Sequence, residues 1–209
     1  MSAGQEFHRH FSACPLIAII RGVRPEEAKA IGEALYEGGV RIIEIPLNSP
    51  DPIDSIRRLA THLGDRALVG AGTVLKASQV EEVHVAGGRL IVSPNTNPEV
   101  IAAAVTCGLV SCPGAFTPTE AFAAIEAGAH ALKFFPAEAG SPAVIRAQRT
   151  VLPRDIPILA VGGITLDNFA AWRAAGADGF GVSSALYKPG QSPAETLAKA
   201  TAFVAALHR

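Results

Sequence analysis

Charged residues are scarce in this sequence, and neither sign dominates. Only 18% of the 209 residues are Asp, Glu, Lys or Arg, and the formal net charge is -1. A protein without a basic surface has no electrostatic means of gathering nucleic acid or an anionic membrane. We therefore expect neither as a partner, and an anionic ligand would have to be held by a few local groups.

Cysteines and long apolar runs are also lacking. The three cysteines, Cys14, Cys107 and Cys112, are an odd number, and the last two are five residues apart, which is not the spacing of a metal-binding pair. We therefore expect buried free thiols in a reducing cytoplasm. No apolar run is long enough to span a membrane, and the first residues lack the apolar core of an export signal.

A repeated unit is what the chain does have from Pro15 onward. A helix rich in Ala and Glu, a glycine-containing turn and a short apolar strand recur every 19 to 26 residues, roughly. The expected strands are residues 16–20, 41–45, 67–71, 89–93, 109–112, 130–135, 157–161 and 178–182. The expected helices begin near Pro25, Asp51, Ala77, Pro98, Pro118, Ser141, Leu166 and Pro193.

Strict alternation of strand and helix predicts an α/β fold, the (β/α)8 TIM barrel, as one domain over residues 15–209. The alternative is an open doubly wound sheet, but the turn after the first strand, residues 20–23, lacks the glycine pattern typical of that fold. Residues 1–14 are polar, and we expect a mobile extension that packs on or near the barrel. Its histidines, His8 and His10, are expected to be structurally neutral.

One expected strand carries a lysine in the middle of an apolar run. Lys133 lies between Gly128 and Pro136, in a stretch too short for a helix. Burying an ammonium group costs several kcal/mol unless it is paired or gives up its proton. A desolvated lysine becomes a nucleophile near neutral pH, so Lys133 is a candidate catalytic residue. The alternatives are a side chain that reaches out to water or one that pairs with a carboxylate.

The repeat predicts which side chains share a layer inside the barrel. We align the units on the glycines that close four helices: Gly39, Gly88, Gly128 and Gly176. The residues five positions later are Glu44, Ser93, Lys133 and Gly181. Alternate strands of a barrel contribute to one interior layer, so Glu44 is expected opposite Lys133. A buried ion pair without chemistry is the alternative.

Glycines and serines follow the last two expected strands. Gly162 and Gly163 follow one, and Ser183 and Ser184 follow the other. Glycine N–H groups, helix starts and serine hydroxyls bind anions, and the loops after strands seven and eight are the usual phosphate position in a TIM barrel. Arg21, after the first strand, suits a carboxylate or a phosphate because its guanidinium can bind either in a bidentate way.

Five motifs carry a resemblance to a known family. They are residues 44–50 (Glu-Ile-Pro-Leu-Asn-Ser-Pro), 70–75 (Gly-Ala-Gly-Thr-Val-Leu), 91–95 (Ile-Val-Ser-Pro-Asn), 133–136 (Lys-Phe-Phe-Pro) and 161–165 (Val-Gly-Gly-Ile-Thr). Over nearly its whole length the chain resembles the 2-keto-3-deoxy-6-phosphogluconate/galactonate aldolases. The first motif is closer to the galactonate branch, because Asn48 replaces an arginine of the gluconate branch. The motif at Lys133 is closer to the gluconate branch.

The resemblance implies roles for particular residues. Lys133 matches the imine-forming lysine and Glu44 the acid/base glutamate, without metal or cofactor. The implied pyruvyl-binding residues are Arg21, Thr73, Pro94 and Phe135. The implied phosphate-binding residues are Gly162, Gly163, Ser183 and Ser184. Val161 replaces a threonine that can hydrogen-bond the C4 hydroxyl in the gluconate branch.

The implied reaction is that of a class I aldolase, a lyase that forms a Schiff base. It would cleave 2-dehydro-3-deoxy-6-phospho-D-galactonate to pyruvate and D-glyceraldehyde 3-phosphate, and the resemblance suggests a homotrimer. Two alternatives remain open: the same reaction on the gluconate epimer, and a non-catalytic sugar-phosphate binding barrel. A metal-dependent aldolase is disfavoured because none of the expected strands ends in His. Glu138 is a reserve acid/base candidate.

Overall fold

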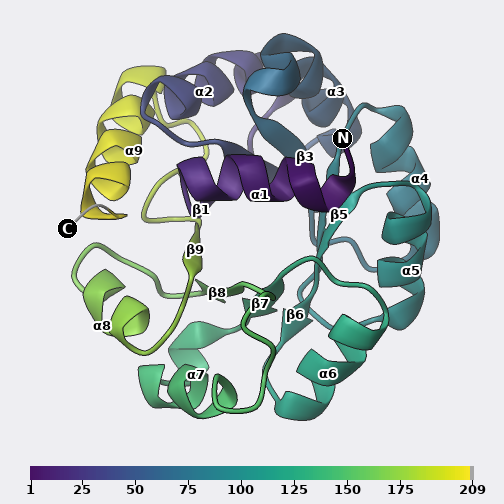
Figure 1. The fold of residues 1–209 in the computed structure, drawn as a ribbon. Helices are drawn as coiled ribbons and strands as arrows, with labels where there is room; N and C mark the ends of the chain where they lie inside the picture. The colour runs from purple at the N-terminus through teal and green to yellow at the C-terminus, as the bar shows by residue number, and fades with distance from the viewer. Residues whose placement is uncertain (208–209) are drawn as a thin grey trace.

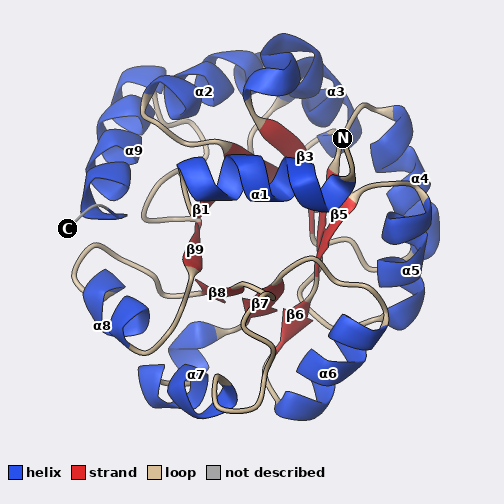
Figure 2. Cartoon of the chain, in the orientation of Figure 1, coloured by secondary structure: helices blue, strands red, loops and turns tan. Residues whose placement is uncertain are grey.

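A ring of parallel strands surrounded by helices forms the centre of the computed structural model, which describes residues 1–207 (Figure 1). The strands are β1 (Leu16–Ile19), β2 (Ile42–Pro46), β3 (Leu68–Gly72), β4 (Leu90–Val92), β5 (Val110–Cys112), β6 (Gly114–Ala115), β7 (Leu132–Phe134), β8 (Ile158–Val161) and β9 (Gly179–Val182). The predicted (β/α)8 barrel is confirmed, because strands and helices alternate around the ring (Figure 2).

The ninth strand comes from an interruption at Pro113. β5 pairs with β4 and corresponds to the predicted strand at residues 109–112, whereas β6 pairs with β7 and continues that strand past Pro113, beyond its predicted end. Pro113 has no N–H to donate, but its carbonyl accepts a hydrogen bond from the Lys133 N–H at 2.9 Å. The Ser111 carbonyl likewise accepts from the His130 N–H at 2.9 Å. These bonds close the ring on the side where the lysine strand lies.

The outer helices are α2 (Pro25–Glu37), α3 (Pro52–Leu63), α4 (Ala77–Val85), α5 (Pro98–Thr106), α6 (Pro118–Glu126), α7 (Pro142–Gln148), α8 (Phe169–Ala174) and α9 (Pro193–Leu207). Two short 3-10 helices are η1 (Gly64–Arg66) and η2 (Ala137–Ala139). Proline at the first helical position loses no hydrogen bond there, and all but α4 and α8 begin with one. α8 begins later than predicted because Asn168 closes a turn, with its amide donating to the Gly163 carbonyl at 2.7 Å.

The N-terminal residues form a helix, so the expectation of a mobile start is wrong. Helix α1 (Ala3–Ala13) crosses one end of the barrel (Figure 1). Phe7 and Phe11 join the apolar cluster inside the ring, and His10 beside them is only 4% exposed. The spacing of these three residues places them on one helical face. A Cβ on Gly179, at the start of β9, would lie 2.6 Å from the Phe11 ring, so α1 closes the end where the strands begin.

Apolar side chains pack in two shells. One cluster fills the ring interior, and the other fills the space between the strands and the outer helices. Strands buried on both faces explain the near-continuous apolar runs in the sequence. Because α1 covers the end where the strands begin, we expect a ligand to enter at the other end, where the strands finish. Within residues 1–207, no helix is long and apolar enough to cross a membrane.

Candidate active site

A cavity of about 180 Å³ opens where the strands finish. Its lining includes all of the sequence-predicted site residues except Glu44 and the reserve candidate Glu138: Arg21, Thr73, Pro94, Lys133, Phe135, Val161, Gly162, Gly163, Ser183 and Ser184. They come from the ends of six different strands, β1, β3, β4, β7, β8 and β9, which is the usual construction of a TIM-barrel site. The structure therefore brings the predicted pyruvyl-binding and phosphate-binding residues to one cavity, with Lys133 among them.

Glu44 lies deeper, inside the barrel. It lines a small void of about 10 Å³ together with Lys133, Val161 and Gly181. Lys133, Val161 and Gly181 also line the larger cavity, so the void adjoins the cavity floor. Lys133 therefore has Glu44 on its inner side and the open cavity on its outer side.

The predicted interior layer is correct at three positions and wrong at the fourth. Val92, rather than Ser93, lines the inner void with Glu44, Lys133 and Gly181. The reason is the pair Gly87 and Gly88: the glycine in the left-handed backbone conformation is Gly87, with φ 87°. Gly87 is therefore the equivalent of Gly39, Gly128 and Gly176, and the residue five positions after it is Val92. The alignment on Gly88 is one residue out of register, and an error of one residue exchanges the two faces of a strand.

Lys133 is almost completely removed from water. Its exposure is 7%, and burial lowers the pKa of its ammonium group, with the negative charge of Glu44 acting in the opposite direction. The Nζ atom lies 4.6 Å from the centre of the Phe135 ring. An ammonium group can be stabilised there by the ring face, and a neutral amine can lie there without penalty. The site thus holds a lysine that loses its proton more easily than a solvated one.

Glu44 is even more deeply buried, at 1% exposure. Burial raises the pKa of its carboxyl group to about 7, although the charges of Lys133 and Arg21 act to lower it. Its Oε2 atom is buried and has no hydrogen-bond partner among the described residues. A Cβ on Gly72 would lie 1.7 Å from this oxygen, so any larger residue at position 72 would have to displace the carboxylate. A carboxyl group that titrates near pH 7 can both accept and return a proton.

Asn48 positions Arg21, although the sequence identifies Asn48 only as a difference from the gluconate branch. The Nη1 of Arg21 donates a hydrogen bond to Oδ1 of Asn48, near the start of the loop after β2. The two residues are far apart in the chain, so no local pattern indicates the pair. Only the order of strands in the barrel indicates this contact, because it places the ends of β1 and β2 side by side.

The predicted phosphate-binding loops are adjacent to η2. Gly162 and Gly163 have φ values of 105° and 65°. A Cβ on Gly163 would lie 2.8 Å from the Glu138 Cβ and 3.0 Å from its Oε2. The glycine there is therefore required by backbone conformation and by close packing. Glu138 is exposed and lies beside this loop instead of lining the cavity with Lys133.

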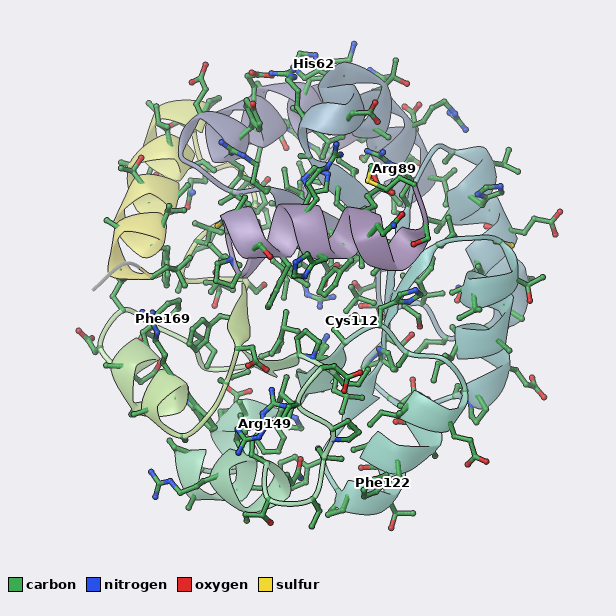
Figure 3. All side chains as sticks on the ribbon, viewed as in Figure 1. His62, Arg89, Cys112, Phe122, Arg149 and Phe169 are labelled. Atoms are coloured by element: carbon green, nitrogen blue, oxygen red, sulfur yellow. The ribbon has the colours of Figure 1, made fainter. Side chains whose placement is uncertain are left out.

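Cys112 is an interior residue that the sequence analysis treated only as a buried thiol. It lies on the wall of the ring (Figure 3) and lines the inner void with Lys133 and Glu44. Burial raises the pKa of its thiol to about 12, so the group is neutral. All three cysteines are free, as predicted, with Cys14 and Cys112 buried. Within the described part of the chain, no group of three or more His, Cys, Asp or Glu side chains could hold a metal ion.

The fold and the cavity together define a class of protein: a barrel enzyme with a buried lysine and a buried carboxyl group at the floor of its site. A family model described as "KDPG and KHG aldolase" matches residues 8–202. The chain belongs to this aldolase family, and aldolases are lyases, so the predicted enzyme class is confirmed.

Individual relatives agree with the family match. The chain is 53% identical to a probable 2-dehydro-3-deoxy-6-phosphogalactonate aldolase of Rhizobium meliloti, over 92% of this chain and 91% of that protein. It is 51% identical to 2-dehydro-3-deoxy-6-phosphogalactonate aldolase of Escherichia coli, over 92% and 94%. A solved structure described as native KDPGal has a TM-score of 0.91 at 50% identity, covering 93% of this chain and 94% of that one.

Proposed function

We propose that the protein is a class I aldolase that cleaves 2-dehydro-3-deoxy-6-phospho-D-galactonate to pyruvate and D-glyceraldehyde 3-phosphate. One observation carries the proposal: a buried lysine faces a buried glutamate at the floor of a cavity whose rim carries glycines and serines. Burial lowers the pKa of the lysine ammonium group and raises the pKa of the glutamate carboxyl group to about 7, so both groups are shifted toward their neutral forms.

Lys133 is the proposed nucleophile. Its neutral amine attacks C2 of the 2-keto acid, and loss of water leaves a protonated imine. As the C3–C4 bond breaks, its electron pair moves into the imine and gives an enamine. The imine therefore acts as the electron sink, and support for this role comes from the lowered pKa of Lys133.

Glu44 is the proposed acid/base residue. As the C3–C4 bond breaks, it takes the proton of the C4 hydroxyl, directly or through water, and the C4 carbon becomes the aldehyde of glyceraldehyde 3-phosphate. It then gives a proton to the enamine carbon, which becomes the methyl group of pyruvate. Hydrolysis of the imine releases pyruvate and restores the amine. A pKa of about 7 suits both directions of proton transfer.

The cavity rim is proposed to hold the two charged ends of the substrate. Arg21, Thr73, Pro94 and Phe135 would surround the pyruvyl end. The groups proposed for the phosphate are the backbone of Gly162 and Gly163 and the side chains of Ser183 and Ser184. Positive φ values at both glycines turn the loop so that N–H groups can approach an anion.

The galactonate-derived epimer is proposed as the preferred substrate because the two relatives of more than 50% identity carry that name. Release of pyruvate, coupled to a pyruvate-consuming reporter, tests the proposal on both C4 epimers. We expect activity on both and a preference for the galactonate epimer. Release of no pyruvate from either epimer would overturn the function and favour a non-catalytic sugar-phosphate binding barrel.

A homotrimer in the cytoplasm is proposed as the working form. The family resemblance implies the trimer, and exposed apolar side chains such as Phe122 and Val151, at 46% and 58% exposure, are consistent with an outer face that a second copy could cover. Free thiols support a reducing compartment. Light scattering should give three times the chain mass of 21.6 kDa. A mass of one chain would contradict the proposed assembly.

A further inference from the structure

Thr73 has an unusual backbone conformation. Its φ is 58°, in the left-handed region that a β-branched residue rarely adopts. Such residues occur where the surrounding structure holds them, often at functional sites. Thr73 is half-buried and lines the cavity near Lys133.

Both chain neighbours of Thr73 are fixed by hydrogen bonds. The carbonyl of Gly72 accepts from the Leu47 N–H at 2.8 Å, and the Val74 N–H donates to the Val92 carbonyl at 3.2 Å. The carbonyl of Val74 also accepts from the hydroxyl of Ser93 at 2.7 Å. Ser93 is 3% exposed, so this last bond is shielded from water and is the only one of the three made by a side chain.

Thr73 itself is left free for a ligand. Among the described residues, neither its N–H nor its hydroxyl donates a hydrogen bond to another part of the chain. Pro94 directly follows Ser93 and lines the same cavity. Ser93 therefore ties together two parts of the cavity wall, although its own side chain points away from the barrel interior.

We propose that Ser93 is a positioning residue whose hydroxyl holds Thr73 in the left-handed conformation and thereby sets the affinity for the pyruvyl carboxylate. The inference rests on the proposed function in placing that carboxylate at Thr73. Without the Ser93 hydroxyl, the Val74 carbonyl loses its buried partner, and the turn can relax toward a negative φ at Thr73. The donors of Thr73 then move away from the carboxylate, while Lys133 and Glu44 remain in place.

Ser93→Ala tests the proposal, with Ser93→Thr as the variant that keeps the hydroxyl and Ser111→Ala as a matched buried serine on the next strand. Loss of one buried hydrogen bond is expected to raise the KM and the pyruvate concentration for half-maximal borohydride trapping by about 5- to 30-fold. The kcat should stay within about twofold, because the reacting groups are unchanged. Ser93→Thr and Ser111→Ala should resemble the parent.

A second variant separates positioning from general destabilisation. Glycine adopts positive φ without strain, so in a Thr73→Gly background Ser93→Ala should change the KM much less than in the parent. Equal effects of Ser93→Ala in both backgrounds, or a lowered melting temperature with unchanged pyruvate affinity, would overturn the proposal.

A crystal structure of Ser93→Ala gives a readout that does not depend on activity. Thr73 should have left the left-handed region, and a φ still near the parent value would overturn the proposal even if the enzyme is an aldolase. Absence of pyruvate trapping in the parent protein would instead overturn the proposed function and the affinity claim with it. The φ of Thr73 in the variant would still decide whether Ser93 holds the turn.

Discussion

Glu44 on β2 and Lys133 on β7 face each other across the inside of the barrel and line the same void. Burial raises the pKa of the glutamate and lowers that of the lysine, while the attraction between their charges opposes both shifts. A buried carboxyl beside a buried amine can exist as an ion pair or as two neutral groups, and burial favours the neutral form. Burial therefore shifts the pair toward the neutral amine, the form of lysine that attacks a carbonyl carbon.

Lys133 should be the lysine that becomes covalently labelled when the protein is reduced with borohydride in the presence of pyruvate. Its amine is desolvated, whereas Lys199 on α9 keeps an ion pair with Glu195 at 2.8 Å at the surface. Peptide mass mapping should place the adduct on the peptide that contains Lys133. Lys133→Arg should abolish labelling and Lys199→Arg should not. An adduct on another lysine would refute the imine mechanism.

Glu44→Gln should separate imine formation from proton transfer. The amide has nearly the same shape but cannot accept a proton, so kcat should fall by roughly 10²- to 10⁴-fold. Trapping by borohydride should persist, and exchange of the pyruvate methyl protons with deuterated solvent should be almost lost. Glu138→Gln is the matched control, because Glu138 lies outside the cavity lining, and it should keep the exchange. If Glu44→Gln still exchanged the methyl protons at the parental rate, a group other than Glu44 would be the base.

Cleavage should respond to pH through Glu44. The carboxyl must be ionised to take the C4 hydroxyl proton, and burial raises its pKa to about 7. The kcat/KM is therefore expected to rise as the pH increases through about 7. In Glu44→Gln, the residual activity should no longer show this rise through about pH 7. A parent profile that is flat across this range would contradict the assignment.

The positions of most strands and helices could be predicted because each depends on short-range chemistry. Strands buried on both faces appear as apolar runs, and prolines mark helix starts. Either of two neighbouring glycines, Gly87 or Gly88, could close helix α4. Counting from Gly88 instead of Gly87 predicts that Ser93 faces the barrel interior, whereas Val92 does. Helix α1 was missed because its buried face contains His10 between two phenylalanines, which makes it look polar.

The contacts within the site were less predictable than its residues. Family motifs identified the cavity lining, but the bonds from Arg21 to Asn48 and from Ser93 to Val74 join parts of the chain that only the folded barrel brings together. The left-handed conformation of Thr73 also has no signal in the sequence, because nothing about a threonine indicates positive φ.

Acid should weaken the attachment of α1 to the barrel. Burial lowers the pKa of His10 to about 4, and the positive charges of Arg9, Arg89 and Arg41 act in the same direction, opposed by Asp65. The folded state therefore keeps His10 neutral while the unfolded state takes up a proton below pH 6.5. Stability is lost as the pH falls from about 6.5 to about 4, by about 1 to 3 kcal/mol for this group.

Urea unfolding at pH 7.5 and pH 5 checks this expectation. His10→Gln should lose less stability between the two pH values than the parent does, because the variant has no group to titrate at that position. His8→Gln changes an exposed histidine on the same helix and should keep the parental difference. An equal pH effect in His10→Gln and the parent would show that His10 does not carry this dependence.

Val161 is expected to control which C4 epimer is cleaved. The two possible substrates differ only at C4, the carbon whose hydroxyl loses its proton. Val161 is 6% exposed and lines both the cavity and the inner void, between Lys133 and the proposed phosphate loop. A hydroxyl that points at its methyl groups loses water without gaining a partner, which costs roughly 1–3 kcal/mol. This corresponds to about tenfold or somewhat more in kcat/KM against the gluconate epimer.

Val161→Thr should narrow the gap, chiefly by improving the gluconate epimer. Threonine has nearly the volume of valine, so it should fit at position 161. The neighbouring residue, Gly181, has no side chain, and a Cβ on Gly181 would lie only 2.8 Å from the Val161 Cγ2. The new hydroxyl would give the gluconate C4 hydroxyl a partner and add nothing that the galactonate epimer needs. Val92→Thr makes the same change inside the barrel but away from the open cavity, so it should leave the ratio unchanged. The kcat/KM of both epimers in the three proteins decides the matter: a Val161→Thr ratio equal to that of the parent would show that another residue selects the epimer.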